Sequence, residues 1–255
     1  MRKGFTLIEL MIVIAIIAVI AAIAIPGLLA AQRASNERNA GASLKTVTSA
    51  QADFRANDRD ANRVNDFWTL DLFGLYGLIP IQGGAAAPPA DQPNPTNVLK
   101  LIEPALAGAD GLTDEAQYGN IQFATSLVTG TSKAGYGFRA LHNEVTGGVV
   151  LTLLNDTDGA TFYGAVHDND RFAFIAFPLS INSGKMMFIV NEDNTLWRYN
   201  LPSTYQATFT PATGVNTNSV STTGGAGLDP FLTLGASGTG TFPAAPPSIG
   251  CSKMD

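Results

Sequence analysis

The N-terminal stretch holds the first residues whose types and spacing suggest chemistry. Glu9 is the single charged residue in an otherwise apolar run from Phe5 to Ile25, and a carboxylate in hydrocarbon costs a few kcal/mol unless it is paired. Hydrolysis of the peptide bond after Gly4 would create an amino group on Phe5, about one helical turn from Glu9. The same two groups could also pair between neighbouring copies of the chain. A free amine on Phe5 and a buried Glu9 would therefore give a reason to process the chain and a reason to assemble it.

A second group of residues has the spacing of a calcium-binding loop. Alternate residues in such a loop turn oxygens toward one hard cation. The candidate ligands are Asp58, Asp60, Asn62, the backbone of Val64, and Asp66. Arg63 stands where such loops have glycine, and Thr69 replaces the final acid. A polar loop that ends a helix through side-chain hydrogen bonds, with Arg59 and Arg63 beside the carboxylates, explains the same residues without Ca²⁺.

The sequence predicts no enzyme. The two histidines are His142 and His167. The stretch His167-Asp168-Asn169-Asp170 could supply a base or a metal cluster, but a histidine beside aspartate after a strand is more typical of a solvated turn. Phosphate-binding loops, nucleophile elbows, HExxH and CxxC motifs do not occur in the sequence. We expect no cofactor besides the Ca²⁺ considered above.

A long N-terminal helix must position the first group. Residues 5–25 would span roughly 30 Å as a helix, the thickness of one bilayer core. Arg2 and Lys3 predict that the N-terminal end stays in the cytoplasm and that the rest is exported. An ordinary secretory signal cleaved after Ala24 and a plain single-pass anchor are alternatives, but both leave Glu9 unexplained.

The helix is expected to continue to about residue 56, although Pro26 should kink or locally melt it. Its second half carries a narrow, mostly apolar stripe at three- and four-residue spacing, formed by Ala40, Leu44, Val47, Gln51 and Phe54. This stripe is expected to pack against a globular head. The aromatic residues 67–79 are expected to lie against it, and residues 98–109 to form a short helix that Pro104 interrupts.

The remainder of the head has the pattern of strands. They are expected at 135–142, 148–154, 160–166, 171–177, 185–190 and 195–199, with hairpin turns at 155–159 and 191–194. Short connections favour antiparallel pairing. The predicted fold class is therefore α+β, with a long N-terminal helix packed on an antiparallel sheet.

Composition limits what the rest of the chain can do. Residues 201–255 are rich in Gly, Ser, Thr and Pro, so they are expected to be an extended or disordered tail with edge strands near 205–210 and 230–234. Cys251 is the single cysteine and cannot form a disulfide within the chain. The net charge is −6, and removal of Arg2 and Lys3 would lower the 15 basic residues to 13 against 21 acidic ones. This acidity argues against a nucleic-acid-binding surface.

The segment Lys3-Gly4-Phe5-Thr6-Leu7-Ile8-Glu9 resembles the signal sequence of type IV pilins and type II secretion pseudopilins. The resemblance implies a leader of residues 1–4 that prepilin peptidase cuts after Gly4, N-methylation of Phe5, and assembly guided by Glu9. It also implies a helix of residues 5–56 whose first part, 5–25, lies in the membrane and then in a filament core. A head of residues 57–200 and the tail follow.

The function implied is that of a structural subunit of a type IV pilus-like filament. Its partners would be further copies of itself, other pilins, prepilin peptidase and the assembly machinery of the inner membrane. The chain would cross the inner membrane once before assembly, and then lie in a filament at the cell surface or in the periplasm. Two alternatives are a pseudopilin of a type II secretion system and a membrane-anchored extracytoplasmic binding module.

Overall fold

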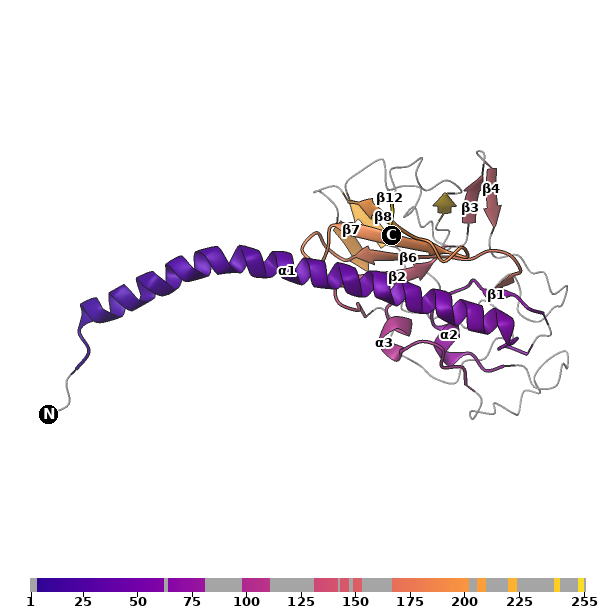
Figure 1. Cartoon of the computed structure of the whole chain (residues 1–255), viewed down its shortest axis with the longest axis horizontal. Coiled ribbons are helices and arrows are strands. Elements are labelled where there is room, and N and C mark those ends of the chain that lie inside the picture. Colours follow the sequence, from indigo (N-terminus) through magenta and orange to yellow (C-terminus); the bar gives the residue numbers. More distant parts are fainter. Residues whose placement is uncertain are drawn as a thin grey trace.

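The computed structural model describes residues 4–61, 64–80, 98–110, 131–141, 143–146, 149–152, 167–201, 206–209, 220–223, 241–243 and 252–254. A 50-residue helix, α1 (Leu7–Ala56), projects from a head built of strands and short helices (Figure 1). The long helix and the antiparallel sheets confirm the predicted α+β class.

Helix α1 has two halves in different surroundings. The large apolar side chains between Phe5 and Leu29 are exposed, whereas the predicted stripe from Ala40 to Phe54 is buried. Pro26 lies inside the helix without ending it, so the helix continues as expected and does not melt locally at the proline. Figure 1 instead shows a gentle curve in the projecting half. Curvature displaces the carbonyl that the proline ring would meet, and it is easily accommodated where no side chain packs around it.

The main sheet of the head has five antiparallel strands in the order β12-β8-β7-β6-β2. The strands are β2 (Tyr136–Ala140), β6 (Ala173–Pro178), β7 (Met186–Asn191), β8 (Leu196–Asn200) and β12 (Ser252–Lys253). The predicted hairpin turn at 191–194 joins β7 to β8, with Val190 opposite Leu196. Strand β12 means that the end of the tail adds a strand to the sheet, which the composition of the tail did not indicate.

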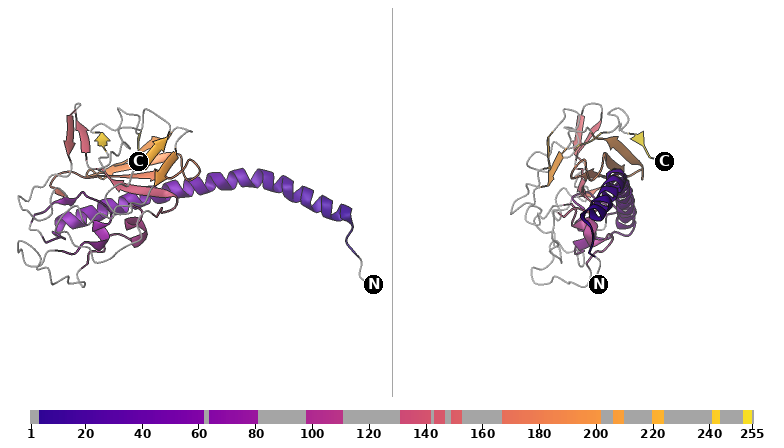
Figure 2. Two further views of the ribbon diagram at one scale, coloured as in Figure 1. Left: turned by 180° about the vertical axis from the view of Figure 1, so that it is seen from behind. Right: turned by 90° about the vertical axis from the view of Figure 1, so that its left-hand side faces the viewer.

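The second half of α1 packs on this sheet, where it contacts β6, β7 and β8. Figure 2 shows the helix lying along one side of the head. Polar side chains on α1 also bond to the loop between β6 and β7. The Arg33 guanidinium donates to Oδ1 of Asn182 at 3.0 Å, and Oε1 of Glu37 accepts from the Lys185 amide at 2.8 Å. The buried stripe thus has hydrogen bonds beside it that fix the position of the helix.

The aromatic segment 67–79 packs against the other side of α1, as expected. It contains β1 (Phe67–Trp68) and α2 (Gly74–Gly77), and Trp68, Leu72 and Leu75 are fully buried. The short helix α3 (Pro104–Ala107) begins at Pro104. The prediction that this proline interrupts a helix was therefore wrong, because the first helical position needs no N–H donor.

Three smaller sheets complete the described strands. Strand β1 pairs with β5 (His167–Asp168), and β9 (Gln206–Phe209) pairs with β10 (Val220–Thr223), both antiparallel. Strand β3 (Asn143–Thr146) pairs with β4 (Val149–Thr152) and with the parallel strand β11 (Thr241–Pro243). The strand predicted at 148–154 thus pairs with the preceding strand. The predictions for 155–166 and 230–234 fall outside the described residues, as does Cys251.

Candidate functional site

The N-terminus of α1 is closed by Thr6 and Glu9, which cap the helix reciprocally. Glu9 Oε2 accepts from the Thr6 amide at 2.9 Å and from the Thr6 hydroxyl at 2.7 Å. The Glu9 amide donates back to Thr6 Oγ1 at 3.3 Å. This capping box satisfies amide groups that have no partner within the helix. In the single uncut chain, Glu9 therefore serves its own helix.

The surface around this cap is apolar and open. Gly4 and Phe5 lie just before the helix, and Phe5 is 84% exposed. An 18-residue window of α1 reaches a mean hydropathy of 3.1 with none of it buried. Among the helices described, α1 alone has the length and apolar composition to cross a membrane. The helix fits a membrane-anchored precursor, because exposed apolar side chains are favourable in lipid and unfavourable in water.

The predicted calcium-loop residues lie where α1 ends. Asp58 is half-buried in a left-handed conformation (φ 43°), and Val64 lies further along the loop. Asp60 and Asp66 are 0% and 1% exposed, whereas Asn62 lies outside the described residues. Outside this group, Arg59 pairs with Asp53 of α1 at 2.9 Å. The loop thus closes the helix with polar contacts and sends two of its carboxylates into the head.

These two carboxylates lie close to His167, which is far from both of them in the sequence. His167 Nε2 lies 3.3 Å from Asp60 Oδ2, and Nδ1 lies 3.8 Å from Asp66 Oδ2. His167 is 1% exposed and its ring packs edge-on against Trp68 at 5.3 Å. The expectation that His167 lies in a solvated turn was wrong. Its neighbour Asp168 does form a turn, since Oδ1 accepts from the amides of residues 170 and 171.

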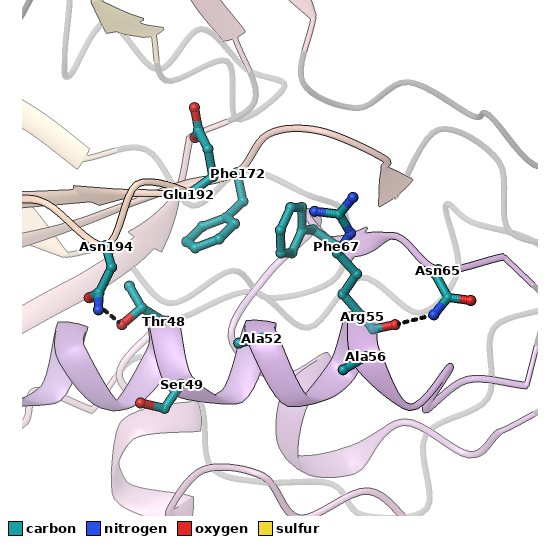
Figure 3. Close-up of a pocket in the computed structure, with 10 residues that line it drawn as sticks. All are labelled: Thr48, Ser49, Ala52, Arg55, Ala56, Asn65, Phe67, Phe172, Glu192 and Asn194. Carbon is teal, nitrogen blue, oxygen red and sulfur yellow. Dashed lines mark hydrogen bonds between the residues drawn. The ribbon is translucent and has the colours of Figure 1, made fainter.

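A pocket of about 610 Å³ lies between α1 and the head near this loop (Figure 3). Phe67 and Phe172 meet edge to face at 4.9 Å along one wall, and the Arg55 guanidinium lies 4.8 Å from the centre of the Phe67 ring. Asn194 holds the other end, where its Oδ1 accepts from the Thr48 hydroxyl at 3.0 Å. The pocket combines aromatic walls with polar groups, which is typical of small-ligand sites.

The head also buries a group of charged side chains beneath α2. Asp71 Oδ1 accepts from the Trp68 indole at 3.0 Å and from the Gly74 amide at 2.7 Å, while Asp110 Oδ2 accepts from the Leu72 amide at 2.5 Å. Burial raises the pKa of Asp71 to about 6. Burial, together with the Asp71 carboxyl, raises the pKa of Asp110 to about 8 despite the nearby Arg139. These hydrogen bonds go to the backbone and to an indole, so the group holds the α2 segment in place.

Comparison with protein families identifies the N-terminal segment. Residues 1–25 match the family model described as the prokaryotic N-terminal methylation motif. The curated proteins and the solved structures give no significant match. The matched segment contains Gly4, Phe5 and Glu9, and it also includes most of the exposed apolar part of α1. The chain thus carries at its N-terminus the prepilin-type cleavage and methylation motif of type IV pilins and pseudopilins.

Proposed function

We propose that this protein is a structural subunit of a type IV pilus-like filament that assembles through α1. The observation that carries the proposal is the combination of the methylation motif with a helix whose first half is apolar, exposed and free of contact with the head. A soluble monomer would bury such a surface. Neighbouring copies would cover it in a filament.

Processing and assembly use the same few residues. Prepilin peptidase cuts after Gly4, and the new amino group on Phe5 is methylated. In the precursor, Glu9 accepts hydrogen bonds from Thr6. In the filament, Glu9 pairs with the Phe5 amine of a neighbouring copy, which neutralises both charges in an apolar core. Packing of the helices and this charge pair drive association, because the apolar surface moves between two environments of similar polarity.

Before assembly, α1 crosses the inner membrane with Arg2 and Lys3 on the cytoplasmic side. The head then lies on the exported side, and the filament extends to the cell surface or into the periplasm. Other pilins and the assembly machinery of the inner membrane are the expected partners. A pseudopilin of a type II secretion system would use the same residues in a short periplasmic filament.

The pocket between α1 and the head supports a second candidate, a membrane-anchored extracytoplasmic binding module. Its aromatic wall and its polar end could hold a small ligand. In that case the head would carry the function, and α1 would serve as a tether.

Intact mass and location of the native protein test these candidates together. Filaments sheared from cells should contain this chain, with a mass that lacks Met1 to Gly4 and carries one added methyl group. The chain confined to short filaments in the periplasm would favour the pseudopilin. A processed chain that stays in the membrane as a monomer would favour the binding module, and cleavage after Ala24 would contradict all three.

A further inference from the structure

The pairing of β1 with β5 brings the two buried carboxylates and the imidazole together. Trp68 lies opposite His167 in this antiparallel pair. Asp66 lies two residues before Trp68, and its Oδ2 lies 3.8 Å from Nδ1 of His167. Asp60 reaches the same place from the turn after α1. Two parts of the chain that are far apart in sequence, the loop after α1 and β5, therefore converge on one point.

The three side chains are the kinds that bind metal ions. One donor atom from each of Asp60, Asp66 and His167 lies within 4.8 Å of the other two, and all three residues are buried. Tetrahedral zinc holds its donor atoms roughly 3.4 Å apart, so small side-chain rotations would supply three of its four ligands, and a water molecule or a second carboxylate oxygen would supply the fourth. A divalent ion would also balance the charge of the two carboxylates.

The imidazole decides which ion fits. Calcium takes six to eight oxygen ligands, whereas imidazole nitrogen favours zinc and its neighbours in the first transition series. Each ring nitrogen of His167 faces a carboxylate. Either ring nitrogen can therefore join a carboxylate oxygen as a ligand of one shared ion.

We propose that Asp60, Asp66 and His167 form a structural site for one divalent transition-metal ion, with zinc preferred over calcium. The site joins the loop after α1 to β5, and so fastens the end of the assembly helix to the head. The packing of the His167 ring against Trp68, and against Phe54 of α1 at 6.3 Å, makes the metal part of the core. This inference does not depend on the proposed filament.

The test uses the full chain, without a histidine tag, purified in detergent and freed of metal with a chelator. Zinc should bind at one ion per chain, and at a hundredfold excess over its Kd it should raise the melting temperature by about 5–10 °C. Calcium should produce no comparable rise. Cobalt bound at the same site should show the visible absorption of a nitrogen- and oxygen-ligated ion, which zinc displaces.

Two variants separate the site from incidental binding. His167→Gln should abolish stoichiometric zinc binding, whereas His142→Gln, the same change at the chain's other histidine, should keep it. If His167→Gln does not fold, the wild-type stoichiometry and cobalt spectrum decide. Zinc that neither binds at one per chain nor raises the melting temperature would overturn the proposal. Asp60, Asp66 and His167 would then be a buried polar cluster that binds no metal ion.

Discussion

Asp71 and Asp110 are carboxyl groups that the head removes from water. Each accepts a hydrogen bond from a backbone amide of the segment before or within α2, and Arg139 of β2 contributes a nearby positive charge. Burial nevertheless raises both pKa values, to about 6 and about 8. At this scale the consequence is a dependence of folding stability on pH.

A carboxyl whose pKa is higher in the folded chain than in the unfolded one binds a proton more tightly when folded. The stability it contributes is fully present below the unfolded pKa of about 4 and is lost as pH rises through the folded values. We expect the contribution of this pair to fall between about pH 4 and pH 8.

Asp110→Asn should flatten this dependence, because the amide oxygen still accepts from Leu72 but cannot ionise. Melting temperatures of the full chain in detergent, with a chelator present, would show it between pH 5 and pH 8.5. Asp170→Asn, a change at an exposed carboxylate, is the control. If the melting temperatures of wild type and Asp110→Asn changed with pH in parallel, the ionisation of Asp110 would not be the cause of the pH dependence.

At the scale of elements, α1 is held to the head mainly by its second half. Gln51 is fully buried and bonds both backbone groups of Trp68: its Nε2 donates to the carbonyl at 2.5 Å, and its Oε1 accepts from the amide at 3.1 Å. This pair of bonds joins α1 to β1. Strand β1 in turn pairs with β5, so the same bonds help to place His167.

Gln51→Leu should destabilise the protein by about 2–4 kcal/mol, because it keeps the volume but leaves a buried N–H and a buried C=O without their partner. Chemical or thermal unfolding of the full chain in detergent measures the change. Gln32→Leu makes the same substitution at an exposed position of α1 and should change stability by less than about 0.5 kcal/mol. Equal effects at both positions would contradict the role of Gln51 in joining α1 to β1.

Periodicity and turn chemistry allowed much of the fold to be predicted. The α1 stripe from Ala40 to Phe54 and the hairpin turn at 191–194 are local patterns, and the structure contains both. The pairing of β12 with β8 could not be predicted, because it depends on contacts between distant segments. The same limit hid the Asp60–His167 contact, since 107 positions separate the two residues. Local spacing marked Asp60 and Asp66 as candidate metal ligands and His167 as part of a possible metal cluster, but it could not show that these residues meet.

At the scale of the whole molecule, an exposed apolar rod extends from a head without a recognised catalytic motif. The head covers only the second half of α1, so the first half remains for lipid or for other copies of the chain (Figure 1). In our proposal the helix builds the filament and the head forms its outer surface. Glu9 has two roles in this account: its side chain caps α1 together with Thr6, and its charge pairs with the Phe5 amine of a neighbouring copy. Substitutions can test the two roles separately.

Two single substitutions divide these roles. Glu9→Gln keeps an acceptor for the capping box, because glutamine serves at that position, but removes the charge. Thr6→Ala removes the side-chain cap and keeps the charge. Both variants should insert in the membrane at wild-type levels and be cut after Gly4.

The most direct measurement is the fraction of each variant recovered in filaments relative to the membrane, in cells that carry the native assembly machinery. We expect Glu9→Gln to be incorporated at least about tenfold less than wild type, a difference of about 1.4 kcal/mol. Thr6→Ala should be incorporated within about twofold of wild type. Incorporation of Glu9→Gln at the wild-type level would contradict assembly through the Glu9 charge.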